Sequence, residues 1–345
     1  MNARSAYQAG VKAIASCFPP HRRHEAAEFP WIRQGLLPAV TLLASVWAAS
    51  AADQGFSFQE VDAKSLGLYD DGKPVLVYNH GVISRSGVPA DRARSGYVHP
   101  LYGLDGEVVS DDFPKDHYHH RGLFWAWPHV IIEGKHYDLW MLKGIEQRFE
   151  KWLARDVDAK GATLAMENGW YVGDQKVMQE TVRLRVGPVV GKGRAIDVDL
   201  TLKPIGKPVT LRGAEDKSYG GLTFRIAPGT NTVITIPLGS PSADLPVTNL
   251  PWADLTRKLD GRTEPSGVAV FISPKHPDFP PEWLTRHYGV LCVGWPGVKE
   301  QTIPAGKEMH FSYRVWIHRG SVTSDEVAAA YAAWVAQDAG NKPTK

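Results

Sequence analysis

Short runs of apolar and β-branched residues, separated by turn residues, follow one another along most of the chain. Such runs are typical of strands. From Val198 to Leu202 apolar and polar residues alternate strictly, which predicts a strand with one face in the core and one in solvent. Two other runs, at residues 267–273 and 288–294, are continuously apolar, which is typical of strands buried on both faces. The strands predicted in this way cover residues 73–80, 97–104, 177–186, 194–203, 267–273, 288–294 and 309–317. A Gly/Lys turn joins the strands at 177–186 and 194–203, which predicts a hairpin.

One helix is predicted, near the end of the chain. Thr323 and Glu326 form a capping box before an alanine-rich run that extends to Gln337, and Gly340 and Pro343 end it. Strands that are separated by turns, without intervening helices, indicate an all-β fold. The length fits one large antiparallel β-sandwich with a short C-terminal helix.

An apolar segment near the N-terminus predicts export. Within residues 35–52 an apolar stretch is followed by small residues, and residues 49–51 fit the small-x-small rule of a cleavage site. The stretch is too short for a membrane span. We expect residues 1–52 to be a signal peptide with an N-terminal extension, and residues 53–345 to be a single β-sandwich domain that is periplasmic or secreted. A membrane-anchored form is the alternative.

Charge and cysteine content restrict the function classes. The chain carries 39 Lys and Arg against 37 Asp and Glu, so its net charge is +2, and without a long basic block it is not expected to bind nucleic acid. It has no phosphate-cradling glycine loop before a helix, no G-x-S-x-G elbow and no H-E-x-x-H helix. Cys17 lies in the predicted export segment, so Cys292 has no disulfide partner, and its apolar surroundings indicate a small buried hydrophobe.

The densest group of chemistry-bearing side chains is DHYHHRGLFWAW, residues 116–127. In an extended segment, His117 and His119 would point to one face and His120 to the other. Two imidazoles on one face can share a metal ion or divide acid and base roles. Arg121 can pair with a carboxylate or an anionic substrate group. The alternative is a solvated loop whose histidines only hydrogen-bond to the backbone.

Three further features carry candidate residues. YGGLTFR (219–225) has paired glycines before a strand that contains Arg225; the alternative is a turn with a surface arginine. Residues 273–289, SPKHPDFPPEWLTRHYG, form a stiff proline-rich loop that either binds a ligand or only connects strands. Glu180 lies within a strand, and facing inward it would need a partner or a raised pKa, which would suit a general base.

As a set, these motifs resemble those of the bacterial PmoA-family proteins. The resemblance spans roughly residues 78–320 and is carried by YVHPLYGLDGE, FPKDHYHHRGLFWAW, YGGLTFR and HPDFPPEWLTRHYG. It implies a galactose-mutarotase-like supersandwich, a fold whose proteins mostly act on sugars and whose mutarotases pair a histidine acid with a glutamate base. The family name suggests a methane oxygenase, but a membrane subunit of that kind needs several spanning helices, and this chain has one apolar segment.

We therefore expect a carbohydrate-active enzyme, a lyase, hydrolase or epimerase that acts on a sugar or an oxidised (3-keto) glycoside by His/Glu acid–base chemistry. The predicted catalytic residues are His117, His119, Glu180 and His276. The predicted substrate-binding residues are His120, Arg121, Trp125, Tyr219, Arg225, Trp283, Arg286 and His287. The candidate cofactor is a divalent metal ion held by His117, His119 and His276. The alternatives are a non-catalytic carbohydrate-binding protein and a metal-dependent oxygenase.

Overall fold

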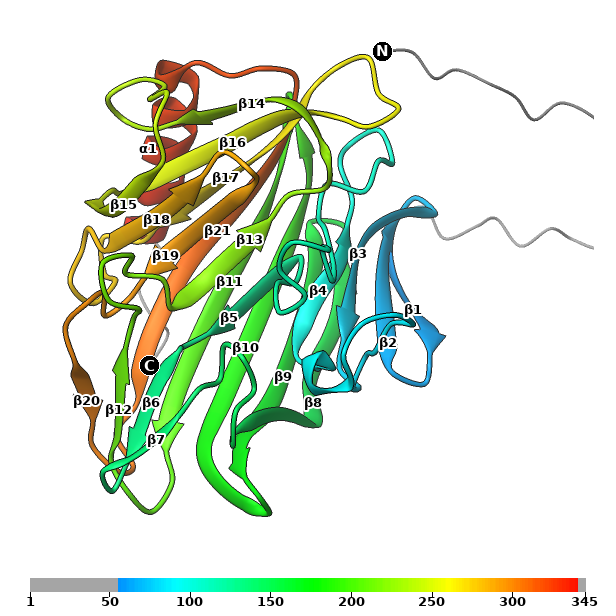
Figure 1. The fold of residues 1–345 in the computed structure, drawn as a ribbon. Coiled ribbons are helices and arrows are strands. Elements are labelled where there is room, and N and C mark those ends of the chain that lie inside the picture. Colours follow the sequence, from blue (N-terminus) through cyan, green and yellow to red (C-terminus); the bar gives the residue numbers. More distant parts are fainter. Residues whose placement is uncertain (1–54, 341–345) are drawn as a thin grey trace, which may run out of the picture. The chain divides into compact units, whose positions relative to one another are not determined.

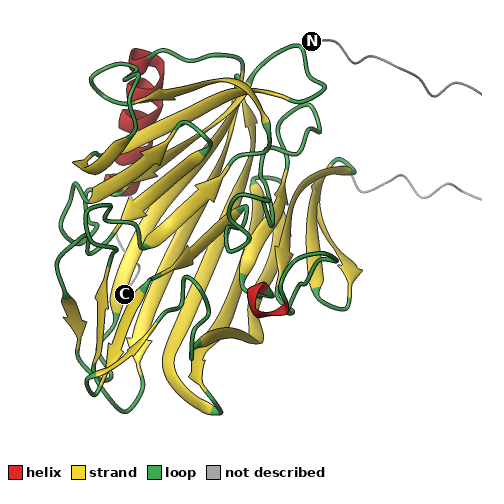
Figure 2. Cartoon of the chain, in the orientation of Figure 1, coloured by secondary structure: helices red, strands yellow, loops and turns green. Residues whose placement is uncertain are grey.

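Strands and turns make up almost all of the structure, a computed structural model that describes residues 55–340 (Figures 1 and 2). The strands form three antiparallel sheets of nine, eight and four strands. Within the described residues a single 3-10 turn, η1 (Ala90–Arg92), and the C-terminal helix α1 (Ser324–Gly340) complete the secondary structure. The predicted all-β class, antiparallel sheets and C-terminal helix are confirmed.

The order of strands in each sheet brings distant parts of the chain together. In spatial order, the nine-stranded sheet contains β1 (Phe56–Asp62), β2 (Ser65–Asp70), β3 (Lys73–Asn79), β4 (Tyr97–Leu101), β5 (Leu123–Ala126), β13 (Gly221–Arg225), β19 (Val290–Gly294), β18 (Glu282–Arg286) and β15 (Leu245–Asn249). The eight-stranded sheet contains β14 (Gly229–Thr235), β16 (Trp252–Leu259), β17 (Ser266–Ile272), β21 (Met309–Arg319), β11 (Gly193–Pro204), β10 (Gln175–Val190), β9 (Gly161–Val172) and β8 (Glu146–Asp158). The four-stranded sheet contains β20 (Gln301–Ile303), β12 (Val209–Arg212), β6 (His129–Ile132) and β7 (Lys135–Tyr137). The neighbours β5 and β13 lie within the motifs at residues 116–127 and 219–225, and β18, which follows β19 in the sheet, lies within the motif at residues 273–289.

The alternating pattern at residues 194–203 produces the expected strand. In β11 the apolar residues Val198, Leu200 and Leu202 are buried, and Asp197 and Asp199 lie on the other face. The strand pairs with β10 over most of its length, which confirms the predicted hairpin. Burial of each such apolar side chain stabilises the fold by roughly 1.5–3 kcal/mol.

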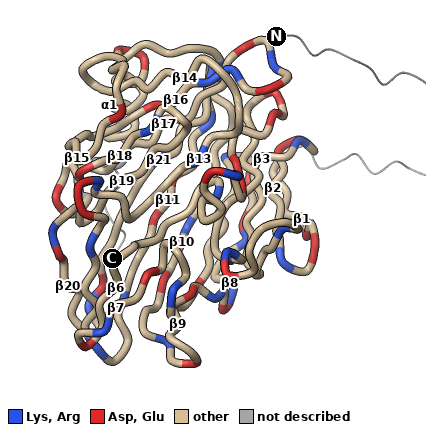
Figure 3. Tube along the Cα trace, viewed as in Figure 1, with Lys and Arg blue, Asp and Glu red and all other residues tan. Residues whose placement is uncertain are grey.

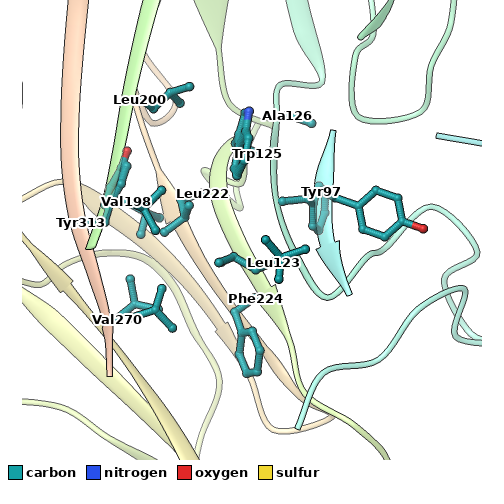
Figure 4. Packing of buried hydrophobic residues seen from close by; sticks show 14 of the residues in the cluster. Tyr97, Leu123, Trp125, Ala126, Val198, Leu200, Leu222, Phe224, Val270 and Tyr313 are labelled. Atoms are coloured by element: carbon teal, nitrogen blue, oxygen red, sulfur yellow. The ribbon is translucent and has the colours of Figure 1, made fainter. Parts of the chain in front are cut away.

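Both large sheets contribute to one buried cluster. Leu222 and Phe224 of β13 and Trp125 of β5 belong to it, together with Val198 of β11 and Val270 of β17 (Figure 4). Because successive residues of a strand point to opposite faces, Thr223 and Arg225 of β13 must lie on the other face of the nine-stranded sheet. That face carries the site described below.

The continuously apolar run predicted at residues 267–273 is buried on both faces, because α1 packs against the eight-stranded sheet (Figure 1). Phe271 of β17 contacts Tyr331 and Trp334 of the helix, with ring centroids 5.7 and 6.2 Å apart. The predicted capping box is present: the backbone N–H of Thr323 donates to Glu326 at 2.8 Å, and that of Glu326 donates to the Thr323 hydroxyl at 3.3 Å.

The predicted export segment, residues 1–52, lies outside the described residues. The described residues belong to one compact unit. Within this part of the chain, no helix combines the length and the apolar character that a membrane span requires. Acidic and basic residues are interspersed along it (Figure 3), in keeping with the small net charge.

Candidate functional site

A cavity of about 360 Å³ lies over one face of the nine-stranded sheet. Its floor is formed by Leu284 and Arg286 of β18 and by Val290 and Cys292 of β19. These residues share a face because Leu284 pairs with Cys292, and Arg286 with Val290, in the antiparallel register. The walls come from four loops, which contribute His117, His119, His120, Trp140, Lys217, Tyr219 and Tyr288.

Two consecutive turns shape the histidine wall. The backbone N–H of His117 donates to the carbonyl oxygen of Pro114 at 3.0 Å, and that of His120 donates to the carbonyl oxygen of His117 at 2.8 Å. The prediction that this segment is extended is therefore wrong, and so is the prediction that His120 points away from the other two rings. His117 and His120 stack with centroids 4.7 Å apart, and His119 meets His120 edge-on at 4.6 Å. The three imidazoles line one cavity.

An acidic residue and an arginine support this wall from outside. Asp116 lies 3.0 Å from Nδ1 of His117, and Nη2 of Arg225 donates to both oxygens of Asp116 at 3.0 Å. The guanidinium of Arg225 also lies over the ring of Tyr288, which stacks on His117 at 5.2 Å. Burial alone would raise the pKa of Asp116, but the contacts from His117 and Arg225 outweigh burial and hold it below its ordinary value. Arg225, predicted to bind substrate, instead orients the histidine wall.

Two of the three imidazoles are held in the neutral form. Burial lowers the pKa of His119 to about 3, and the positive charges of Arg94, Arg92 and Arg121 act in the same direction. Burial also holds the pKa of His120 well below its ordinary value, and Nδ1 of His120 is buried without a hydrogen-bond partner among residues 55–340. A neutral imidazole in a cavity can accept a proton, so this wall offers a base at neutral pH.

Aromatic side chains lie next to the histidines in the cavity wall. Trp140 packs against Tyr219 with centroids 4.8 Å apart, and its ring lies 6.1 Å from that of His119. Burial raises the pKa of both Tyr219 and Tyr288, so both phenols keep their protons at neutral pH. Tyr219 was predicted to bind substrate and does line the cavity. Trp140, Lys217 and Tyr288 were missed; Tyr288 lies within the HPDFPPEWLTRHYG motif, but no sequence signal marks the other two.

Arg121, a predicted substrate-binding residue, lies behind the site. Its side chain is 1% exposed, and its guanidinium donates to the carbonyl oxygens of Tyr118, His120 and Arg92. It also lies 3.7 Å from the ring centroid of Phe113 and 3.4 Å from Asp112. Arg121 does not line the cavity, and its hydrogen bonds hold the backbone of the histidine turns.

The two predicted stacking tryptophans point into the core. Trp125 pairs with Leu222 and Trp283 pairs with Val293, and these partners face away from the cavity. Both indoles are fully buried, and Nε1 of Trp283 donates to the carbonyl oxygen of Leu250. Neither ring lines the cavity. The strand register therefore places both rings in the core and not at the cavity, where a substrate contact was predicted.

Glu180 and His276, two predicted catalytic residues, lie outside the cavity. Glu180 is fully buried and accepts hydrogen bonds from Trp170, Asn168 and Gln147 at 2.7, 2.8 and 3.0 Å. His276 is buried between its contacts to the carbonyl oxygen of Pro277 and the hydroxyl of Tyr313. The polar atoms of both side chains are satisfied by hydrogen bonds within the protein.

The predicted metal set is not assembled. His276 does not join His117 and His119 at the cavity. Across the described residues, no group of three or more His, Cys, Asp or Glu side chains is arranged to hold a metal ion.

The remaining predicted residues lie at or beside the cavity. Arg286 lines it and contacts Asp244 at 3.3 Å. His287 contacts the same carboxylate at 2.9 Å but does not line the cavity. Cys292 is buried as predicted and forms part of the floor, where burial raises the pKa of its thiol to about 11. The proline-rich stretch is a loop only up to residue 281, because residues 282–286 form β18.

We expect acid to destabilise the fold, because several buried histidines are neutral in it. Burial lowers the pKa of His119 to about 3 and those of His99 and His276 to about 4. An unfolded chain, with histidines near 6.5, binds more protons between about pH 4 and 6.5. The free energy of unfolding therefore falls as pH drops through this window, by up to about 1.4 kcal/mol per pH unit for each histidine.

Asp112 acts in the opposite direction, because burial raises its pKa to about 6. As the pH falls, the native state therefore binds this proton at a higher pH than the unfolded chain does, which stabilises the native state. Urea unfolding between about pH 7 and pH 4.5 measures the net slope. In a His276→Gln variant, the slope should be smaller than in the wild type. An unchanged slope would mean that His276 is protonated in the native state.

Comparison with known proteins adds three findings. A search of curated protein sequences gives no match. Among similar solved structures is a protein described as a kojibiose phosphorylase from the human microbiome, with a TM-score of 0.33 and 11% identity over 62% of this chain and 25% of that chain. A heparinase III gene product has a TM-score of 0.34 and 10% identity over 79% of this chain and 36% of that chain. A 4-α-glucanotransferase from Thermococcus litoralis has a TM-score of 0.27 and 12% identity over 76% of this chain and 39% of that chain. The chain thus spans well under half the length of these proteins. The model of one protein family, described as "Family of unknown function (DUF6807)", matches residues 65–332, so the chain belongs to that family.

Proposed function

We propose that the cavity is the active site of a carbohydrate-active enzyme that works by acid–base catalysis between His119 and His117. The observation that carries the proposal is the difference between the surroundings of these two imidazoles, whose ring centroids lie 5.5 Å apart over one cavity. Burial and neighbouring positive charge keep His119 neutral. His117 has the carboxylate of Asp116 3.0 Å away as a counter-charge.

These surroundings suit opposite roles. His119 accepts a proton from a sugar carbon or from water, and His117 delivers one to the departing or ring oxygen. Asp116 contacts Nδ1 of His117, so Nε2 remains as the nitrogen for the substrate. The pair replaces the His/Glu chemistry expected from the sequence, because Glu180 is enclosed elsewhere.

The aromatic wall supports a sugar as the ligand. Trp140, Tyr219 and Tyr288 present flat apolar rings and polar tips beside the histidines. The volume of about 360 Å³ lies within the range of small-molecule pockets, about 300–1,000 Å³. The PmoA-family resemblance, which stays a prediction, points to the same substrate class. Because residues 35–52 are predicted to be an export segment, we infer that the enzyme is periplasmic or secreted.

Mass spectrometry of products from a panel of neutral and acidic oligosaccharides tests the proposal. Elimination gives two fragments whose masses sum to that of the substrate. Hydrolysis adds the mass of one water, and epimerisation leaves the mass unchanged but alters the NMR spectrum. Binding by calorimetry without any product would reject the enzyme and favour a carbohydrate-binding protein.

A further inference from the structure

The charged side chains that line the cavity are both cationic. Lys217 and Arg286 line it, and no acidic side chain of the described residues does so. Lys217 is exposed, and its ammonium has no acidic partner within ion-pair distance among those residues. Arg286 contacts Asp244 through Nη1 alone, at 3.3 Å. The cavity therefore holds positive charge that the protein compensates only in part.

Two carboxylates beside the cavity are already engaged. Asp116 is held by Arg225 and His117, and Asp244 by His287 and Arg286. Behind the histidine wall Arg92, Arg94 and Arg121 add further positive charge, which contributes to the low pKa of His119. Charged groups that surround a concave site focus their field on its ligand. The field in this cavity favours an anion.

We propose that the substrate is a sugar that carries a carboxylate, such as a uronic acid residue, and that Lys217 and Arg286 bind this carboxylate. The proposal rests on the proposed function and names its substrate class. The planar fork of Arg286 matches a carboxylate, and the flexible Lys217 supplies a second cation from the facing loop. A neutral sugar would leave both charges facing hydroxyl groups.

A carboxylate in this position determines the reaction that the histidines perform. It acidifies the C–H bond of the adjacent ring carbon, C5, and His119 takes that proton. The electron pair of the C–H bond forms a C4–C5 double bond, and the C4–O bond breaks with its electrons on the departing oxygen. His117 protonates that oxygen. The two cations stabilise the charge that develops on the carboxylate, and neither water nor an oxidant is consumed.

Matched pairs of oligosaccharides, which differ only in a C6 carboxylate or a C6 hydroxymethyl group, test the inference. With the full chain, calorimetry should show that the acidic member of each pair binds at least about tenfold more tightly. Lys217→Gln should remove about tenfold of that affinity and leave binding of the neutral member unchanged. Arg286→Gln should act in the same sense. Lys258→Gln, an exposed lysine on β16, is the matched control and should change neither.

Four outcomes would overturn the inference. The first is that the neutral sugar binds as tightly as the acidic one, and the second is that Lys217→Gln weakens the binding of both equally. The third is that Lys258→Gln has the same effect as Lys217→Gln. The fourth is that acidic sugars bind but give no unsaturated product that absorbs in the ultraviolet. If the neutral sugars are converted and the acidic ones are not, the substrate class is wrong while the proposed enzyme stands. If neither class is bound or converted, both proposals fail.

Discussion

Replacing His119 with alanine should lower turnover by about 10²- to 10⁴-fold, the contribution that a positioned acid or base makes to catalysis. His119 is the cavity imidazole whose pKa burial lowers to about 3, so its ring is neutral at neutral pH and keeps a lone pair for a proton. Its ring borders those of His117, His120 and Trp140, which lie in loops, so its loss leaves the surrounding strands in place. Steady-state rates on the converted oligosaccharide, together with circular dichroism, measure the effect.

His310→Ala provides the control for this experiment. His310 lies on β21, is largely exposed and contacts Glu308 at 3.5 Å. Its replacement should leave turnover unchanged within about twofold, since surface substitutions have small effects on the fold. A His119→Ala protein that folds normally and retains its rate would remove His119 from the mechanism.

Glu180→Ala should lower the free energy of unfolding by about 3 kcal/mol or more, because each buried donor left without an acceptor costs about 1–3 kcal/mol. Three donors, from Trp170, Asn168 and Gln147, converge on the Glu180 carboxylate at 2.7 to 3.0 Å. In the variant they are left without an acceptor in a fully buried place. Denaturant unfolding of wild type and variant gives the difference.

Glu180→Gln separates a structural role from a catalytic one. Glutamine keeps the size and one carbonyl oxygen, so the loss should be about 1–3 kcal/mol. Because Glu180 does not line the cavity, turnover per folded molecule should be unchanged. A glutamine variant of normal stability but low turnover would contradict its placement outside the active site.

The strands and the hairpin could be predicted because the alternation of apolar and polar residues is a local pattern. The face of the sheet on which an individual tryptophan lies could not be predicted in this way. Trp125 and Trp283 look like sugar platforms in the sequence, but their pairing with Leu222 and Val293 turns both into the core. Strand register depends on which distant segments become neighbours, and the sequence of one strand does not contain that information.

Turns set a similar limit on the site. The composition of residues 116–121 indicated a functional histidine wall, and the structure places its three imidazoles at the cavity. Their mutual arrangement was not predictable, because it depends on two hydrogen-bonded turns rather than on strand alternation. Glu180 and His276 show the converse: a polar residue in an apolar stretch can as well be a buried structural group as a catalyst.

A crystal structure of the His119→Ala protein, soaked with the oligosaccharide that the wild type converts, tests the central claim most directly. We expect a sugar ring in the cavity, packed against Trp140 or Tyr219 and within about 3 Å of Nε2 of His117. A sugar bound on another surface of the protein, with water alone between the histidines and the aromatic wall, would contradict the account.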